Sequence, residues 1–187
     1  MSGDMDDNLR EAERIAAILA EERVPAVVIG AVALAAHQYV RSTLDVDFGV
    51  DVDLKRMRGL LATLRSLGYD AQLREPDADD PLGGVIDIPG AFGLVQIVNF
   101  GERFPAAIRD SLSGEDIRLR PDGALRVMPI PQLVALKLYA GGWKSLADIV
   151  ELLRRNPQAD LEKIGETCRK YRLRGWGKVL EELDTNP

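Results

Sequence analysis

The transition at Gly30 constrains the fold of this chain more than any other feature of its sequence. The run Val24–Ile29 is short, rich in β-branched residues and almost uninterrupted, which is typical of a strand covered on both faces. Gly30 ends that run, and an apolar, helix-like stretch over residues 31–40 follows at once. The first part of the chain therefore combines strands with helices.

The next strand carries two acids on one face. In residues 45–51, DVDFGVD, acidic or small residues alternate with large apolar ones, as they do along a strand. Asp45 and Asp47 are two positions apart, so their side chains leave the same face with Cα atoms roughly 6.5 Å apart. That spacing allows two carboxylates to share a divalent cation.

The remaining patterns divide the chain into a mixed part, residues 1–129, and a helical part, residues 130–187. Apolar periodicity predicts a helix over 8–22, capped by Asp7 or Asn8, and another over 54–64. Strands are expected at 69–74, 84–88, 94–99, 117–120 and 124–128. The strands 84–88 and 94–99 flank a PGAFG turn and predict a hairpin, and further helices follow from Pro131 to Leu183.

Composition limits the classes of protein that fit. The 187 residues are 46% hydrophobic and 29% charged, as in an ordinary folded domain, and the net charge of −6 disfavours a nonspecific polyanion-binding surface. A single cysteine, Cys168, excludes an intramolecular disulfide and a cysteine-based zinc site. The acidic first residues do not look like a secretory signal, and no apolar stretch approaches the roughly 20 residues that cross a bilayer. We expect a cytoplasmic protein without a membrane segment.

The segment from 27 to 53 predicts metal and phosphate chemistry. Carboxylates such as Asp45 and Asp47 are the hard ligands that Mg²⁺ prefers, often completed by water and substrate phosphate. Gly30, at the start of a helix, allows the backbone to approach an anion closely, and Arg41 and Thr43 add a cation and a hydroxyl. An isolated acid pair is more often a solvated edge-strand feature. Here the strand, glycine, helix, cation and acids occur in mechanistic order within 27 residues.

These residues resemble the signature of the DNA polymerase β-type nucleotidyltransferase superfamily. More closely, IGAVALAAHQYVRSTLDVDF is similar to the short bacterial nucleotidyltransferases that include AbiEii-like toxins. Downstream, MPIPQLVALKLYAGGWKSLADIVELL resembles the segment of that family with a helical lysine, here Lys137, and a later aspartate, here Asp148. The resemblance covers roughly residues 20–155. It implies an α+β nucleotidyltransferase fold, with a small mixed sheet flanked by helices and a helical C-terminal region.

The resemblance also implies a reaction and its residues. An acceptor hydroxyl would attack the α-phosphorus of a nucleoside triphosphate (NTP), with two Mg²⁺ ions bound and pyrophosphate leaving. Asp45 and Asp47 would be catalytic and bind the metal. The implied nucleotide-binding residues are Gly30, Ala31, Arg41, Thr43 and Lys137.

Three departures from the family pattern leave two functions open. Ala31 replaces a glycine or serine, and Ser145 stands where relatives commonly have an acid. Gln96 occupies the position that best matches the third carboxylate, and a neutral amide cannot act as a general base. Asp87 on the neighbouring strand would substitute only if the hairpin register points it into the site. An active enzyme and a catalytically silent protein that binds nucleotide or a partner are both hypotheses.

Other polar residues have simpler interpretations. His37 is expected in the core or at an interface, since no serine or cysteine partner lies at a telling spacing. The stem of Lys137 could simply lie along apolar residues, and Asp148 could pair with Lys144 on the surface of a helix. Cys168 is treated as structural.

A cationic run near the C-terminus suggests a macromolecular partner. Between positions 169 and 178 no acid occurs, and one aromatic lies among the basic residues. Such a run is more often a solvated helix face, but it can also grip an RNA backbone and stack a base. The RNA hypothesis names Arg169, Lys170, Arg172, Arg174 and Trp176. A toxin-like role with an antitoxin partner comes from the resemblance alone.

Overall fold

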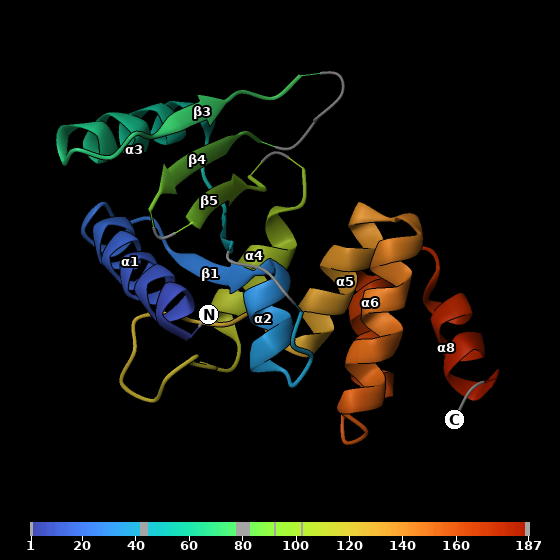
Figure 1. Ribbon diagram of the computed structural model, residues 1–187. Helices are drawn as coiled ribbons and strands as arrows, with labels where there is room; N and C mark the ends of the chain where they lie inside the picture. The colour runs from blue at the N-terminus through green and yellow to red at the C-terminus, as the bar shows by residue number, and fades with distance from the viewer. Residues whose placement is uncertain (1, 42–44, 78–82, 92, 102, 186–187) are drawn as a thin grey trace.

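The computed structural model describes residues 2–41, 45–77, 83–91, 93–101 and 103–185. Helices and strands are mixed in the first part of the chain, and only helices follow from α4 onwards among the described elements (Figure 1). In chain order the elements are α1 (Ser2–Glu21), β1 (Ala26–Ile29), α2 (Gly30–Ala36), β2 (Val46–Val50), α3 (Leu54–Ser66), β3 (Gln72–Arg74), β4 (Val85–Gly90), β5 (Gly93–Asn99), α4 (Pro105–Ser113), α5 (Ile130–Ala140), α6 (Gly142–Arg155), α7 (Leu161–Lys170) and α8 (Trp176–Thr185).

The five strands form one mixed sheet in the order β1-β2-β5-β4-β3. β2 runs parallel to β5, and the other neighbouring pairs are antiparallel. The hairpin expected between β4 and β5 is confirmed, and its register pairs Asp87 with Gln96. On the other side of β5, Gln96 pairs with Asp47 of β2. The acid-bearing strand therefore lies near the centre of the sheet, next to the strand with the amide.

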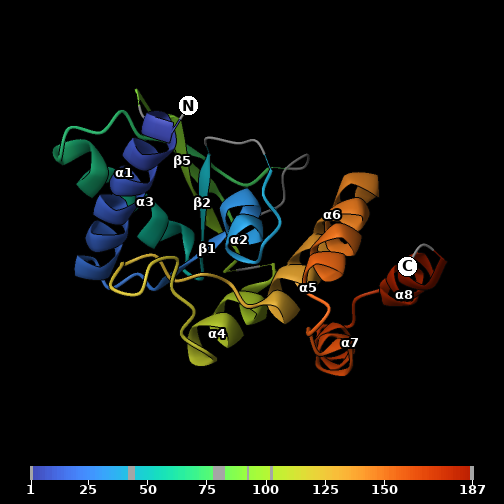
Figure 2. The same cartoon turned by 60° about the horizontal axis from the view of Figure 1, so that its bottom comes forward.

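Helices cover both faces of this sheet. Figure 2 shows α1 and α3 on one side of the sheet and α2 on the other, with α5 and α6 lying beyond α2. The central strands are apolar on the faces that these helices cover, with Phe48, Ile86 and Ile97 almost fully buried. The expected α+β fold, a small mixed sheet flanked by helices and followed by helices, is therefore confirmed.

Two local expectations are wrong. Helix α1 begins at Ser2 rather than near Asn8, so neither Asp7 nor Asn8 caps it. Asn8 is instead buried inside the helix, and its amide has no hydrogen-bond partner among the described residues. The acidic residues before Asn8 continue the helix because negative charge near a helix N-terminus interacts favourably with the helix dipole.

Two segments differ from the sequence-based element boundaries. Helix α4 was not predicted, and it begins at Pro105, a residue favoured in the first turn. The strands expected at 117–120 and 124–128 are reduced to short pairings: Leu119 donates its N–H to Leu125 O, and Val127 donates to Ile117 O. Val127 also forms a bridge to Val28, so this segment contacts the outer edge of β1.

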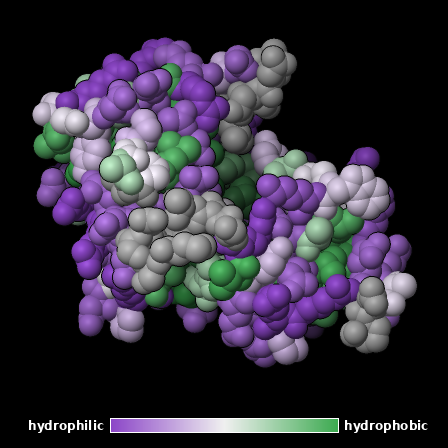
Figure 3. All heavy atoms as spheres, viewed as in Figure 1, coloured by the Kyte–Doolittle hydropathy of each residue, from purple (hydrophilic) through white to green (hydrophobic). Residues whose placement is uncertain are grey.

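The surface is mostly hydrophilic. On the face seen in Figure 3, purple residues predominate, and the molecule is hollowed between the part that carries the sheet and the part that carries α5 and α6. None of the described helices is long and apolar enough to span a membrane.

Candidate functional site

Gly30 is positioned by the junction of β1 and α2. Its φ is +65°, a left-handed conformation that glycine adopts without steric cost. A Cβ atom at this position would overlap the Oδ2 atom of Asp47. The carboxylate of Asp47 therefore lies directly against the backbone of Gly30, which brings the glycine and the acid together as the sequence predicts.

Asp47 is largely buried and lies within the electrostatic reach of two other candidate residues. Burial and, next in size, the negative charge of Asp45 raise the pKa of Asp47 to about 6 against the opposing positive charge of Lys137. Asp45 is exposed just before β2. The acid pair and the helical lysine thus belong to one site, although they lie about 90 residues apart in the sequence.

Asp148 holds two cations beside the acid pair. This α6 carboxylate is only 4% exposed, and its Oδ2 atom is 2.7 Å from both Arg41 Nη1 and Lys137 Nζ. The hydroxyl of Tyr39 donates a hydrogen bond of 3.3 Å to Oδ1. Taken alone, this cluster has one carboxylate and two cations, but Asp45 and Asp47 lie within electrostatic reach of Lys137. The cations would therefore attract an anion once a divalent cation neutralises the acid pair.

These contacts revise the surface interpretations of Lys137 and Asp148. Asp148 is buried and pairs with Arg41 and Lys137, not with Lys144 at the four-residue step of its own helix. The ammonium of Lys137 is held at this pair rather than left in solvent at the end of an apolar stem. Sequence periodicity missed the pairing because Arg41 lies 107 positions from Asp148 and Lys137 lies on the preceding helix, 11 positions away.

A cavity of about 450 Å³ opens beside these groups. It lies between the end of β1 and helix α5, and its walls are mainly apolar. The lining residues are Ile29, Gly30, Phe100, Leu133, Leu136, Lys137, Tyr139, Ala140 and Ser145. An apolar pocket with a few convergent polar groups is typical of a small-molecule site.

The third-carboxylate question has a structural answer. Asp47, Gln96 and Asp87 are register partners on three neighbouring strands, so their side chains leave the same face of the sheet. Gln96 stands between the two acids, and Asp87 is bound to Arg74 and Gln96 rather than to Asp45 or Asp47. Among the described residues no group of three or more His, Cys, Asp or Glu side chains is placed to hold a metal.

The donor set nevertheless fits a hard divalent cation. Asp45 and Asp47 supply carboxylate oxygens, and Mg²⁺ commonly takes only one or two of these from a protein. Gly30 leaves the space beside Asp47 free of a side chain. The raised pKa of Asp47 indicates a buried negative charge that a cation would stabilise.

The other candidate residues have different surroundings. Ala31 follows Gly30 in the first turn of α2, whereas Thr43 lies outside the described residues. His37 is buried, donates from Nε2 to Met128 O, and has a pKa lowered by burial, as suits a core histidine. Burial raises the pKa of the Cys168 thiol to about 11, so little of it is the reactive thiolate.

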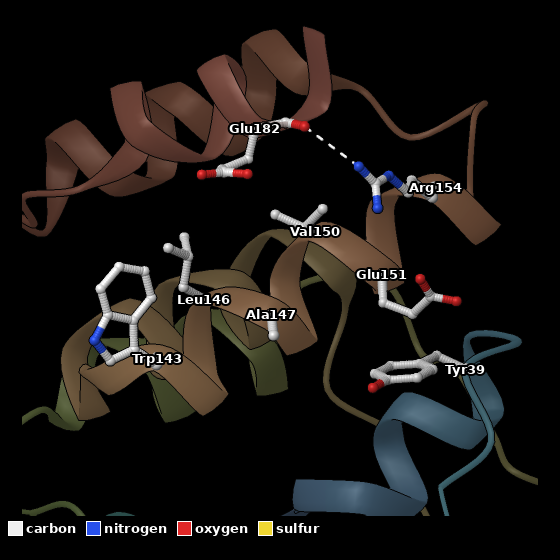
Figure 4. Close-up of a pocket in the computed structure, with 8 residues that line it drawn as sticks. All are labelled: Tyr39, Trp143, Leu146, Ala147, Val150, Glu151, Arg154 and Glu182. Atoms are coloured by element: carbon white, nitrogen blue, oxygen red, sulfur yellow. Dashed lines mark hydrogen bonds between the residues drawn. The ribbon is translucent and has the colours of Figure 1, made fainter. Parts of the chain in front are cut away.

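A second hollow, of about 590 Å³, runs along α6 towards α8 (Figure 4). Trp143, Leu146, Ala147 and Val150 follow one face of α6, and Trp143 is 86% exposed. Tyr39 lines the other end of this hollow and also contacts Asp148. The hollow therefore borders the cation cluster without containing the acid pair.

Three solved structures share the architecture of this chain. The solution structure of the antibiotic-resistance factor ANT(2'')-Ia has a TM-score of 0.57 and 17% identity, over 90% of this chain and 92% of that one. The crystal structure of ANT(2'')-Ia in complex with adenylyl-2''-tobramycin has a TM-score of 0.53 and 18% identity, over 84% and 92%. An antigenic nucleotidyltransferase-like protein from Paracoccidioides brasiliensis has a TM-score of 0.52 and 15% identity, over 89% and 87%.

The chain has a nucleotidyltransferase fold. At these identities the similarity establishes the fold alone. No protein-family model and no curated protein matches the chain, so the AbiEii-like branch stays a prediction from motifs. Within the nucleotidyltransferase fold, the acid pair, Gly30 and Lys137 lie together, as the motif order suggested.

Proposed function

We propose that this protein is a Mg²⁺-dependent nucleotidyltransferase. An acceptor hydroxyl oxygen would form a bond to the α-phosphorus of an NTP, and the bond from that phosphorus to the bridging oxygen would break. The products are a nucleotidylated acceptor and pyrophosphate, and the hydroxyl proton is released. The observation that carries the proposal is the contact of the half-buried Asp47 carboxylate with Gly30, beside a cluster that holds two cations on one acid.

Each side chain has a role that follows from its charge and position. Asp45 and Asp47 would hold the cation, which when bound activates the attacking oxygen and neutralises the leaving one. Lys137 and Arg41 would attract the triphosphate, and Asp148 would keep both cations in place. The apolar cavity beside Gly30 is suited to the base and sugar. Most of the rate enhancement would then come from positioning and electrostatics.

The test is nucleotidyl transfer with each of the four NTPs labelled at the α-phosphate, with and without Mg²⁺. Acceptors would include RNA, the protein itself and small molecules with several hydroxyls. We expect label transfer that requires Mg²⁺ and falls at least a hundredfold in Asp47→Asn. Asp122→Asn, which removes an exposed acid from a distant turn, is the matched control and should keep wild-type activity. Equal transfer by wild type and Asp47→Asn would reject the proposal.

Gln96 favours one alternative function. Because it stands in register with Asp47, a silent protein that binds nucleotide without turnover is the second candidate. It predicts stabilisation of the fold by Mg²⁺ and NTP, with no label on any acceptor. Turnover that depends on Asp47 would exclude this alternative.

RNA is one proposed acceptor. Lys170 is engaged with Asp110 at 2.6 Å, but within the described part of the chain no ion pair involves Arg169, Arg172 or Arg174. Trp176 packs against Gly165, so the aromatic ring more accessible to a base is Trp143. We expect Arg172→Ala/Arg174→Ala to weaken RNA binding and reduce its salt dependence, as lost phosphate contacts do.

A small-molecule acceptor and a toxin-like role are further proposals. ANT(2'')-Ia was crystallised with adenylyl-2''-tobramycin, so amino sugars belong in the acceptor screen. A toxin predicts growth arrest on expression that Asp47→Asn abolishes. An antitoxin predicts a co-expressed protein that relieves that arrest and co-purifies with the chain. Growth unaffected by high expression of the active protein would remove the toxin role.

A further inference from the structure

A cavity of about 590 Å³, which we call the distal cavity, lies in a part of the molecule that the proposed reaction does not use. It is bounded by the ends of α2 and α4, the start of α5 and the segment between α6 and α7. Among the described residues, none lines both this cavity and the one beside Gly30. Gly30 begins α2, whereas His37 directly follows that helix and lines the distal cavity. The two cavities therefore lie at opposite ends of α2.

The wall of the distal cavity includes the one histidine of the chain. His37 is 9% exposed, and its Nε2 lies 2.8 Å from Met128 O. A carbonyl oxygen only accepts hydrogen bonds, so Nε2 carries the ring proton. Burial lowers the pKa of His37, so the ring is neutral at pH 7 and above. Its Nδ1 is therefore a hydrogen-bond acceptor.

Asn156 adds a second acceptor beside His37. It is 4% exposed, and its Nδ2 donates to His37 O at 2.7 Å and to Leu152 O at 2.8 Å. The two carbonyls use both N–H groups of the amide, so the remaining Oδ1 can only accept. The bond to His37 O also ties the end of α6 to the end of α2.

These two acceptors have no hydrogen-bond partner among the residues that the structure describes. They are not sealed in the interior either, because the enclosed side-chain atoms without a partner belong, in the same part of the chain, to Asn8 and Arg126. Both His37 and Asn156 line the distal cavity, so Nδ1 and Oδ1 open onto it. Buried polar groups normally have partners, and a ligand that supplies them here has to donate.

The outer part of the distal cavity is acidic. Glu115 and Asp160 are exposed there, Asp110 is half-buried, and Lys163 also lines the cavity. Asp110 is paired with a lysine of α7 at 2.6 Å. The charges that lack an ion pair in the described part of the chain are then two acids and one lysine. Because the negative charge of Glu115 acts on the ring of His37, these acids lie within electrostatic reach of the inner acceptors.

We propose that the distal cavity binds an aliphatic diamine or triamine. One ammonium group donates to His37 Nδ1 and Asn156 Oδ1, and another lies among the acids of the outer part. The methylene chain between them lies against the apolar side chains of the wall, which include Ile117, Ile130 and Ile164.

The chemistry of the ligand follows from what the wall offers. An ammonium group has three donors and no acceptor, so it matches a wall on which the free groups are acceptors and the net charge is negative. An anion would be repelled by the outer acids. A neutral alcohol could donate to the inner acceptors but would gain nothing from the charge. The volume of the distal cavity is in the range of small-molecule sites.

The direct test observes His37. Because the chain has one histidine, untagged protein with ¹⁵N-labelled histidine gives a single set of ring-nitrogen signals. At pH 8 the ring is neutral and the amines are charged. Titration with 1,4-diaminobutane or spermidine should move the Nδ1 signal towards that of a hydrogen-bonded nitrogen, whereas 1,4-butanediol and sodium chloride of equal ionic strength should not. An unmoved Nδ1 signal, or an equal shift with the diol, would overturn the proposal.

Two charge variants test the outer part, with the dissociation constant of 1,4-diaminobutane measured by calorimetry. Glu115→Gln should raise it about two- to fivefold and Lys163→Gln should lower it by a similar factor, as expected for partly screened charges. Glu162→Gln, an exposed acid in the first turn of α7 outside the cavity lining, is the matched control and should stay within about twofold of wild type. One dissociation constant shared by all four proteins would also reject the proposal.

These measurements need no nucleotide, Mg²⁺ or turnover. Diamine binding at His37 in a protein that transfers no nucleotide would retain the distal site and reject the enzyme. Nucleotidyl transfer by a protein whose Nδ1 signal ignores the diamine would retain the enzyme and reject the distal site.

Discussion

At the scale of single residues, Asp47 makes the stability of the metal-free protein depend on pH. Its pKa is raised from 3.8 to about 6, so folding favours the protonated form. The resulting stabilisation is complete below pH 3.8 and is lost as the pH rises through 6. A difference of about two pKa units corresponds to about 3 kcal/mol. Asp47→Asn should therefore be more stable than wild type by up to that amount at pH 8, with the gap closing towards pH 4.

Urea unfolding of both proteins across this pH range measures the difference. Asp70→Asn, which removes an exposed acid after α3, should give no such pH dependence. Added Mg²⁺ should reduce the difference in unfolding free energy between Asp47→Asn and wild type at pH 8, because only the wild type has the Asp47 carboxylate that the cation stabilises. A constant difference between Asp47→Asn and wild type at every pH would contradict the explanation by burial.

Because Asp148 binds two cations, we expect its removal to destabilise the fold more than the removal of either cation does. Asp148→Asn removes the carboxylate that lies between Arg41 and Lys137, and removing one side of a buried ion pair typically costs about 3–5 kcal/mol. Lys137→Met removes one of the two cations, and Asp148 keeps Arg41. We expect its stability to change by less than about 1 kcal/mol, while triphosphate affinity falls at least tenfold. Urea unfolding measures the stability of both variants, and nucleotide titration measures their triphosphate affinity. Equal destabilisation by Asp148→Asn and Lys137→Met would contradict the explanation that one carboxylate holds two cations.

At this scale, the sequence predicts interactions between residues that are close in the chain and misses those between residues far apart in it. The acid pair is visible because alternation along a strand relates positions 45 and 47 directly. Asp148 was noticed only through a family resemblance, and its partners were missed because Arg41 reaches it from the loop after α2. Tyr39 was not singled out at all, since nothing local distinguishes a tyrosine that donates to a distant acid.

At the scale of elements, the turn from β1 into α2 is the feature most sensitive to substitution. Gly30→Ala places a side chain in a left-handed conformation, which costs about 1–3 kcal/mol, and its Cβ would overlap Asp47. Gly68→Ala has a similar positive φ, of +91°, but open space around the added atom. We expect Gly30→Ala to lose more stability, and Asp47→Ala to relieve part of that loss in the double mutant. Equal losses at the two glycines would show that overlap with Asp47 is unimportant.

The elements were predictable where a periodic pattern was long. The helices after residue 130 and the β4–β5 hairpin follow from spacing and turn residues. Helix α2 ends at Ala36, earlier than its apolar composition suggests, because Gln38 takes a positive φ of 66°. The sequence could not fix the register of β4 on β5, and that register alone decides where Asp87 and Gln96 point.

At the scale of the whole molecule, the cavity joins the two parts of the chain. Gly30 and Phe100 come from the sheet side, and Lys137 and Tyr139 come from α5. The division near residue 130 was expected from the change from mixed strand and helix patterns to helical ones, and it remains a prediction. A nucleotide in this cavity would contact both parts, so its binding energy would add to the stability of their packing.

Thermal unfolding with NTP and Mg²⁺ therefore tests whether the nucleotide binds in this cavity and contacts both parts of the chain. A ligand at 100 times its dissociation constant stabilises the folded state by about 2.7 kcal/mol. For a chain of this length that corresponds to a rise in Tm of roughly 5–10 °C. Lys137→Met and Asp47→Asn change opposite sides of the cavity, and each should reduce the rise, whereas Asp122→Asn should preserve it. A full rise in both Lys137→Met and Asp47→Asn would mean that the nucleotide binds elsewhere, because neither wall of this cavity would then contribute to its affinity.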